Sequence, residues 1–315
     1  MPNRLLKTVI VLTVTGSSVI WPMLMSEKAD ARFGQTLVQS NEAVITNVAA
    51  LSPFFRQLSA IEKHTRQRPL RIIQYGDSHT KADLFTGAVR KNLLRDFGGE
   101  MPSLVKKTAY SPRSGGYGIT VYQPQGVNGA RAKRLRDMSE NPRFLESLAQ
   151  DRPDLIVLAY GTNEVTDQDW TVTSYSQMLI GTINRLRTAA PDASFLIVGP
   201  PDRSVPSAEG WSSVRRMSAL LEAQRRAALS TNAAFWSGYD AMGGAGSMNQ
   251  WVSGGLARYD HVHFTAAGYT KLAGLFYRDL MNSYRAGSRF QPAPVQGIDM
   301  RVMQRNFPIS KKSSN

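Results

Sequence analysis

The 315-residue chain contains no cysteine, so disulfide bonds and thiol catalysis are excluded. It has only four histidines and no second His or Cys cluster to complete a coordination sphere, so neither a metal site nor another cofactor is predicted. The glycine-rich stretch 111–118 lacks the Lys-Ser/Thr ending of a phosphate-binding loop. No aromatic platform for stacking bases accompanies the basic residues, which argues against nucleic-acid binding.

Long apolar runs are also scarce, and the one that approaches the length of a membrane span lies near the N-terminus, at residues 8–25. Two basic residues precede it and the small-x-small sequence Ala29-Asp30-Ala31 follows it. This pattern predicts a secretory signal peptide over residues 1–31 and therefore a periplasmic protein. An uncleaved anchor in the inner membrane is the alternative, although the glycine, serines and proline within the run weaken it.

The charge balance is strongly basic, with 38 Lys and Arg against 24 Asp and Glu and a net charge of +14. A basic surface attracts polyanions. For an exported chain we expect these to be an anionic wall polymer, an acidic polysaccharide or the envelope surface rather than nucleic acid. Generic solubility is the alternative explanation for the charge.

Apolar strand-like runs alternate with helical periodicity along most of the chain. Uninterrupted apolar runs such as 154–160 are typical of strands buried on both faces. The alternation predicts an α/β fold, a three-layer α/β/α sandwich around a central parallel sheet. The expected strands are 71–75, 118–122, 154–160, 193–198 and 233–236, and the expected helices are 83–97, 174–189, 214–230 and 265–282.

The domain organisation follows from where this alternation begins and ends. Residues 32–69 are predicted to form a helical lead-in that packs beside the domain and is broken at Pro53. Residues 70–284 form the main domain, and the basic segment 285–315 is predicted to be a tail of low order. Two irregular stretches, 111–128 and 238–255, are expected to be loops at the ligand-binding edge of the sheet.

Four short motifs follow one another along the chain. They are Gly76-Asp77-Ser78-His79, Gly126-Val127-Asn128-Gly129-Ala130-Arg131, Gly161-Thr162-Asn163-Glu164 and Asp260-His261-Val262-His263-Phe264. Strand-to-helix junctions of a parallel sheet share one edge, so Ser78 and Asn163 are expected there. The loop of His263 can reach this edge from the start of the last helix.

These four ordered blocks resemble those of the SGNH hydrolase superfamily, also called the GDSL family, over residues 70–283. The extended form Gly-Asp-Ser-His-Thr-x-x-Asp at 76–83, with Tyr160–Glu164, resembles the bacterial peptidoglycan O-acetylesterase branch. Members of that branch can carry a carbohydrate-binding module between the first two blocks, whereas this chain has room there only for a loop and a short strand. The resemblance implies a flavodoxin-like three-layer fold.

The resemblance also implies a role for each motif residue. Ser78 is the expected nucleophile, His263 the base that accepts its proton, and Asp260 the carboxylate that orients the imidazole. The backbone N–H groups of Ser78 and Gly129 and the side-chain amide of Asn163 are the expected donors to the oxyanion.

Alternatives exist for several of these residues. His261 competes with His263 for the role of base, although Asp260, its neighbour in sequence, is badly placed to orient it. Gly126 or Gly116 can replace Gly129 as the donor. Asp83 is expected to cap the helix that follows it, and the role of His79 stays open.

The predicted function is an exported serine esterase that removes acetyl or other small acyl groups from an envelope polysaccharide. Peptidoglycan is the first expected substrate and an acylated exopolysaccharide the second, and the enzyme is expected to be a monomer. An O-acyltransferase needs the same residues and differs only in excluding water from the site. A binding protein that kept the fold without catalysis is the remaining alternative.

Overall fold

The computed structural model describes residues 44–98 and 120–289, all of which lie within one compact unit, 41–315. The predicted signal segment 1–31, the stretch 111–118 with Gly116, and residues 290–315 of the predicted tail lie outside the described residues. Within the described part, no helix combines the length and the apolar composition needed to cross a membrane.

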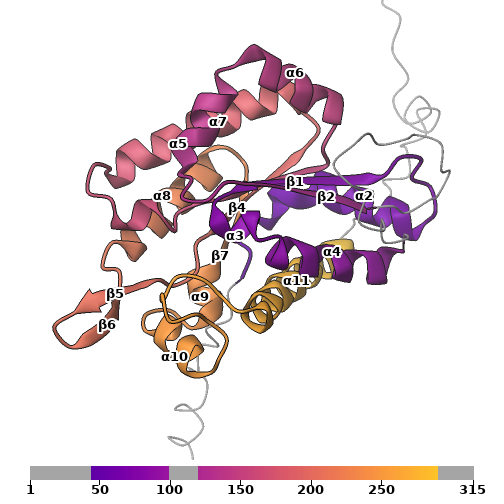
Figure 1. Cartoon of the computed structure of the whole chain (residues 1–315). Coiled ribbons are helices and arrows are strands. Elements are labelled where there is room, and N and C mark those ends of the chain that lie inside the picture. Colours follow the sequence, from indigo (N-terminus) through magenta and orange to yellow (C-terminus); the bar gives the residue numbers. More distant parts are fainter. Residues whose placement is uncertain (1–43, 99–119, 290–315) are drawn as a thin grey trace, which may run out of the picture. The chain divides into compact units, whose positions relative to one another are not determined.

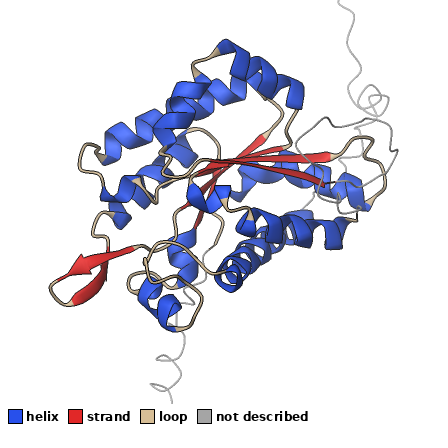
Figure 2. Cartoon of the chain, viewed as in Figure 1, coloured by secondary structure: helices blue, strands red, loops and turns tan. Residues whose placement is uncertain are grey.

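The centre of the domain is a five-stranded sheet in the order β2-β1-β3-β4-β7, and every neighbouring pair is parallel (Figure 2). Each of the five predicted strands is confirmed, with small shifts of the ends. The register places Gly76 opposite both Gly126 and Ala159, so three strands end at one level. The strands are β1 (Leu70–Gly76), β2 (Thr120–Gly126), β3 (Leu155–Ala159), β4 (Ser194–Gly199) and β7 (Ala234–Ser237).

Helices cover both faces of this sheet, and the predicted three-layer α/β/α fold is confirmed (Figure 1). Two separate apolar cores result, one on each face, because the central strands are apolar on both sides. One core is covered by α2 (Ser52–Glu62), α4 (Leu84–Phe97) and α11 (Ala266–Arg289). The other is covered by α5 (Ala132–Ser139), α6 (Pro142–Asp151), α7 (Val172–Ala189) and α8 (Met217–Ser230).

The described part of the predicted lead-in belongs to the core instead of packing beside it. A 3-10 turn, η1 (Val48–Leu51), leads directly into α2. Pro53 lies in the first turn of α2, where a missing N–H group removes no helical hydrogen bond, so it starts the helix rather than breaking it. Phe54 and Leu58 are completely buried.

The stretch 238–255, expected to be an irregular loop, contains two short helices, α9 (Gly238–Met242) and α10 (Ser247–Ser253). A small antiparallel hairpin, β5 (Ser204–Ser207) and β6 (Gly210–Ser213), precedes it and was also not predicted. Tertiary contacts hold these elements. The buried Asp202 accepts hydrogen bonds from the N–H of Met248 and the hydroxyl of Ser213, both at 2.9 Å.

The last helix is longer than its sequence pattern indicated. It was expected to end at Asn282, but α11 continues to Arg289. The helix therefore extends past residue 284, where the domain was predicted to end and the tail to begin. Tyr284 explains part of this extension, because it is buried against the core with its hydroxyl near the Glu62 carboxylate of α2. Packing against α2 therefore extends α11 beyond the point that the sequence pattern marks.

Candidate active site

Ser78 lies on the sharp turn between β1 and the single-turn helix α3 (Ser78–Lys81). This turn packs against the end of β2 more closely than a side chain allows. A Cβ atom on Gly126 would lie 2.1 Å from the backbone nitrogen of Lys81, and one on Gly76 would lie 2.1 Å from Thr80 Oγ1. The two glycines therefore let the turn settle directly on the sheet edge, and Ser78 is fixed there.

The structure joins Ser78, His263 and Asp260 in one line of hydrogen bonds. Ser78 Oγ lies 2.9 Å from His263 Nε2, and His263 Nδ1 lies 2.8 Å from Asp260 Oδ2. The carboxylate can only accept, so the proton sits on Nδ1 and the lone pair of Nε2 faces the serine hydroxyl. This is the arrangement in which an imidazole can take a proton from a serine.

The Asp260 carboxylate is also fixed by its own backbone. Its Oδ1 atom accepts hydrogen bonds from the N–H groups of Val262 at 3.0 Å and His263 at 2.9 Å. Burial alone would raise the pKa of Asp260, but the bonds it accepts, above all from the His263 backbone and ring, hold that pKa below its ordinary value. The Asp260 carboxyl group is therefore ionised at every pH at which the neutral His263 can act as a base.

His261, the competing histidine, faces a different partner. Its ring stacks on the indole of Trp211 in β6, with 3.9 Å between the ring centres and 9° between the planes. Its Nδ1 atom lies 2.9 Å from Asn249 Oδ1. His261 has a φ of +54°, which turns its side chain into this contact. The structure therefore places His263, and not His261, against Ser78.

The expected oxyanion donors surround the same serine. Ser78 is the first residue of α3, so its N–H group has no partner within the helix. Gly129, with a φ of +70°, and Asn163 line one cavity with Ser78. One N–H of the Asn163 amide donates to Ala130 O at 2.9 Å, which leaves the other for a ligand. Gly126 packs against the backbone of Lys81, so Gly129 is the better-placed glycine.

Glu164 ties the turns of Gly129 and Asn163 together. It begins the short 3-10 helix η2 (Glu164–Thr166), and its buried Oε1 accepts from the N–H of Ala132 at 2.6 Å and from Tyr175 at 3.2 Å. Burial raises the pKa of Glu164, although the Ala132 N–H opposes that shift. In the sequence analysis Glu164 appears only as the last residue of the third motif, and no structural role was predicted for it.

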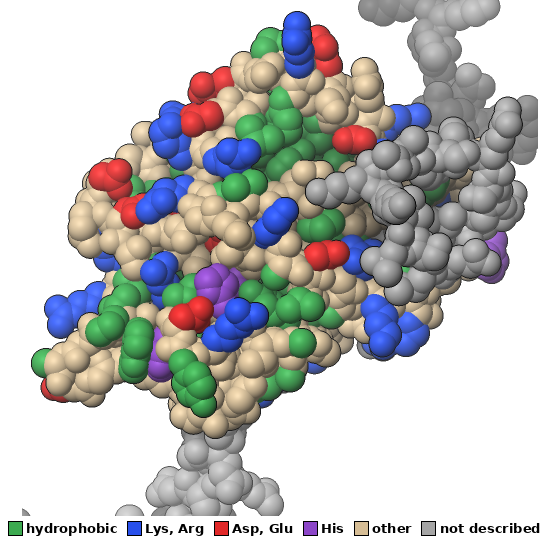
Figure 3. All heavy atoms as spheres, viewed as in Figure 1, with side chains coloured by type: hydrophobic (Ala, Val, Ile, Leu, Met, Phe, Trp, Pro, Cys, Tyr) green, Lys and Arg blue, Asp and Glu red, His purple; other side chains and the backbone are tan. Residues whose placement is uncertain are grey.

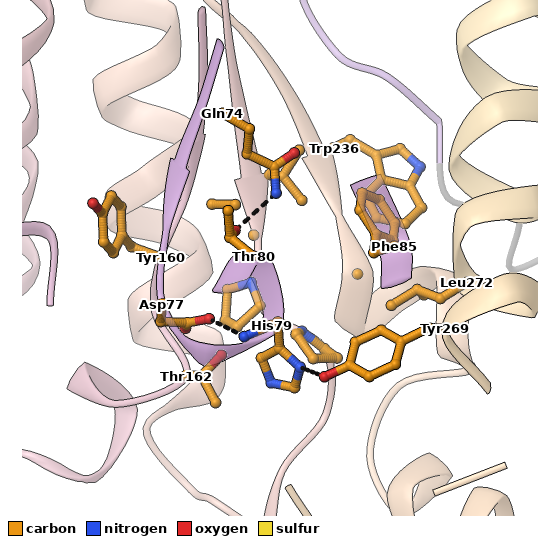
Figure 4. Close-up of a pocket in the computed structure, with 16 residues that line it drawn as sticks. Gln74, Asp77, His79, Thr80, Phe85, Tyr160, Thr162, Trp236, Tyr269 and Leu272 are labelled. Carbon is orange, nitrogen blue, oxygen red and sulfur yellow. Dashed lines mark hydrogen bonds between the residues drawn. The ribbon is translucent and has the colours of Figure 1, made fainter. Parts of the chain in front are cut away.

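His79 lies directly behind the reacting histidine, which gives a location to a residue whose role the sequence left open. Figure 4 shows two of its hydrogen bonds. The backbone N–H of His79 donates to Asp77 Oδ1, and the ring atom Nδ1 lies 2.9 Å from the Tyr269 hydroxyl. The rings of His79 and His263 are 5.4 Å apart. Part of His79 reaches the surface, but its Nε2 is shielded from solvent and has no partner among the described residues. Burial lowers the pKa of His79.

Asp83 follows α3 but does not cap α4 as expected. Its φ is +51°, and its side chain accepts no hydrogen bond from the backbone of the helix. The carboxylate instead pairs with Arg90 at 3.1 Å and accepts a hydrogen bond from the Thr86 hydroxyl. Asp83 therefore joins the side chains of the first turns of α4 and takes no part in the chemistry at Ser78.

The reacting side chains open into a cavity of about 520 Å³, which is large enough for a sugar-sized ligand. Arg203 is one of the lining residues that the sequence analysis missed, because it belongs to no motif. It follows the carboxyl end of β4, and its Nη1 donates to Thr162 O at 2.6 Å. Among residues 44–98 and 120–289, no cluster of three or more acidic or imidazole ligands is arranged to hold a metal ion.

Comparison with known proteins identifies the family. The model of the GDSL-like lipase/acylhydrolase family matches residues 75–271. The chain belongs to this family. The family predicted from the four motifs is thereby confirmed, and the protein is a carboxylic ester hydrolase of the SGNH type. No curated protein matches the chain significantly.

One solved structure shares the fold of this chain. A structure described as "Peptidoglycan O-acetylesterase in action" is 23% identical, with a TM-score of 0.66 over 77% of this chain and 99% of that chain. A lipase/acylhydrolase from Enterococcus faecalis is 17% identical, with a TM-score of 0.47 over 68% of this chain and 96% of that chain. A catalytic mutant of the acetylxylan esterase Axe2 from Geobacillus stearothermophilus is also 17% identical, with a TM-score of 0.45 over the same shares. At 23% identity, the likeness to the first of these structures establishes the fold alone.

Proposed function

We propose that this acylhydrolase is an exported serine esterase that removes O-acetyl groups from a cell-envelope polysaccharide, with peptidoglycan as the substrate. The observation that carries the proposal is the line from Ser78 through His263 to Asp260, with contacts of 2.9 and 2.8 Å at the mouth of a large cavity.

The proposed reaction has two halves. Ser78 Oγ attacks the ester carbonyl while His263 Nε2 accepts its proton, and the tetrahedral oxyanion faces the N–H groups of Ser78, Gly129 and Asn163. The sugar oxygen then leaves with the proton from His263, and the acetyl group stays on Ser78. Water gives a proton to His263 and attacks the acyl-enzyme. The bond between the acyl carbon and Ser78 Oγ then breaks, acetate is released, and His263 returns the proton to Ser78 Oγ, which restores the serine hydroxyl.

Solvent access to the site favours hydrolysis over transfer to a second sugar. The side chains of His263 and Asp260 are 36% and 46% exposed. Water can therefore reach the base in the second half of the reaction, whereas a transferase has to exclude it. This exposure is our reason for proposing a hydrolase on a scaffold that serves both reactions.

Two observations support the choice of polymer. The solved structure with a TM-score of 0.66 is described as a peptidoglycan O-acetylesterase, and the net charge of +14 suits an anionic wall polymer. Export remains a prediction from residues 1–31, and an acetylated exopolysaccharide is the substrate class to compare against.

The experiment measures acetate released by the purified protein from O-acetylated peptidoglycan and, in parallel, from acetylated exopolysaccharides. Peptidoglycan is expected to lose acetate faster, and Ser78→Ala is expected to abolish release. A Ser78→Ala protein that still turns over ester would contradict the whole catalytic assignment. A parallel reaction with an acceptor sugar tests transfer: acetylated acceptor that accumulates faster than free acetate would contradict hydrolysis.

A further inference from the structure

Among the described residues, the catalytic cavity is lined by positive side chains. Lys81, Arg203 and Arg258 belong to its wall, together with Ser78 and His263, and no Asp or Glu of residues 44–98 and 120–289 does. Elsewhere the surface is mixed: on the face shown in Figure 3, basic and acidic side chains are interspersed rather than gathered into one basic patch. The cavity is therefore more uniformly positive than the surface around it, and the net charge of the chain alone does not explain its lining.

These positive groups have no salt-bridge partner within the described part of the chain. Asp83, Asp96, Asp137, Asp151, Asp154, Asp167, Asp240 and Asp279, with Glu140 and Glu222, each pair with other arginines or lysines. Asp167, Asp260 and Asp77 attract Arg203 at longer range, without forming a salt bridge with it. The three cavity cations therefore keep most of their capacity for an anion.

The guanidinium of Arg203 and the backbone of Arg258 are each held by hydrogen bonds. Arg203 is half-buried, and its Nη1 donates to the carbonyl of Thr162, next to Asn163. Its Nε is shielded from solvent and finds no acceptor among the described residues. The backbone of Arg258 is fixed by its N–H bond to His263 O at 2.8 Å and by the bond its carbonyl accepts from the His261 N–H at 3.0 Å. Positive charge is thus positioned on the loop that carries the base.

We propose that this cavity binds a carboxylate on the sugar unit that carries the acetyl ester, between Arg203 and Arg258, with Lys81 adding long-range attraction. The inference rests on the proposed function and specifies it further: the enzyme selects acetyl esters of acidic sugars over those of neutral sugars. A planar guanidinium offers paired N–H donors that match a carboxylate. Peptidoglycan carries free carboxylates on its stem peptides and on the lactyl ethers of muramic acids from which the stem peptide has been removed.

The test compares a carboxylate substrate with its carboxamide, which differ at one charged group, and with a phosphate that tests the kind of anion. The substrates are 6-O-acetyl-N-acetylmuramic acid, the same sugar with its lactyl carboxylate converted to the carboxamide, and O-acetylated N-acetylglucosamine 3-phosphate. We expect kcat/KM for the carboxylate to exceed that for the carboxamide by about tenfold or more, since a hydrogen bond to a charged group contributes about 1.5–3 kcal/mol. The preference is expected in KM, and it is expected to shrink as ionic strength rises.

Variants then assign the preference to residues. Arg258→Gln is expected to reduce the carboxylate-to-carboxamide ratio by about fivefold or more, and Lys81→Gln by less, because an ammonium lacks the paired N–H donors with which a guanidinium matches a carboxylate. Arg143→Gln removes one exposed positive charge from α6, outside the cavity lining, and is the matched control. Its ratio is expected to equal that of the wild type.

The outcomes are distinguishable. Equal turnover of carboxylate and carboxamide overturns the inference and leaves the proposed function standing. Preference for the phosphate over the carboxylate overturns the assignment of the anion, and a ratio that Arg258→Gln leaves unchanged overturns the assignment of the site. A wild-type protein that hydrolyses 4-nitrophenyl acetate but releases acetate from none of the sugars overturns the proposed function and the inference together.

Discussion

The two halves of the catalytic edge are built in different ways. Ser78, Gly129 and Asn163 follow three adjacent parallel strands, so the sheet itself fixes their positions. Asp260 and His263 follow no strand of that sheet. They lie on a loop after α10, supported by the Ala257–Phe264 bridge, the bond from Ser204 N–H to His261 O and the Trp211–His261 stack. The nucleophile is positioned by the sheet, and the base is positioned by a separately anchored loop.

The contrast implies that the two halves fail differently. A change on the sheet side removes a chemical group without moving the others, whereas a change in the loop's support moves the base as a unit. Each prediction below tests one side of that comparison, starting with the largest expected effect.

Asp260→Asn removes the acceptor for the His263 ring and keeps most of the loop's geometry. In the wild type, the backbone N–H groups of Val262 and His263 donate to Asp260 Oδ1, and the side-chain oxygen of an asparagine can still accept both bonds. The ring then loses the partner that fixes its tautomer, and kcat on 4-nitrophenyl acetate is expected to fall about 10⁴-fold. Asp192→Asn, at an exposed position, is the control and is expected to be fully active. More than a tenth of wild-type kcat in Asp260→Asn would contradict the assigned role.

Asn163→Ala tests the sheet side. It removes the proposed side-chain donor to the oxyanion along with the 2.9 Å bond to Ala130 O. Because this donor acts on charge that develops in the transition state, kcat is expected to drop about 100- to 1000-fold with little change in KM. Steady-state kinetics on 4-nitrophenyl acetate measure both constants. A rise in KM with unchanged kcat would assign Asn163 to ground-state binding instead.

Trp211→Ala tests the loop side at a distance from the reacting atoms. The stack on His261 is lost, so the loop that carries His263 is held less tightly, and kcat is expected to fall about tenfold. Trp211→Phe keeps an aromatic face and is expected to recover most of the activity. A small ester such as 4-nitrophenyl acetate is the right substrate here, because it separates positioning of the base from contact with a polymer. Full activity in Trp211→Ala would show that the loop needs no such support.

His79→Gln is expected to have the smallest effect, and the effect depends on pH. Burial lowers the pKa of His79 in the folded protein, while the unfolded chain titrates near about 6.5. The stabilisation by neutral His79 is therefore fully present above that value and is lost as pH falls through the folded pKa. Thermal unfolding between pH 7.5 and 5 is expected to show a steeper loss of Tm for the wild type than for the variant. Parallel slopes for the two proteins would exclude His79 as the titrating group.

The sequence predicted best where chemistry and local pattern coincide. The strands β1, β3, β4 and β7 are apolar runs that need no tertiary context to be recognised, and Ser78, Asn163 and His263 belong to short motifs at the ends of elements. The elements it missed depend on distant partners. The hairpin and α10 are joined through the carboxylate of Asp202, which follows β4 and contacts both. Arg203 was missed for the same reason, because only the folded chain places it beside Ser78.

The bridge between Thr46 and Phe235 has a consequence for the limits of the folding unit. The two residues exchange backbone hydrogen bonds of 2.9 and 3.2 Å along the outer side of β7, the last strand of the sheet. An uncovered sheet edge is a template on which other chains can add as strands. The family match begins only at residue 75, so a chain shortened to that boundary would lose most of the inner strand β1. It would also expose the edge at β7 and the apolar surface that Phe54 and Leu58 now cover. Such a protein is expected to aggregate during folding, although every catalytic group is still present.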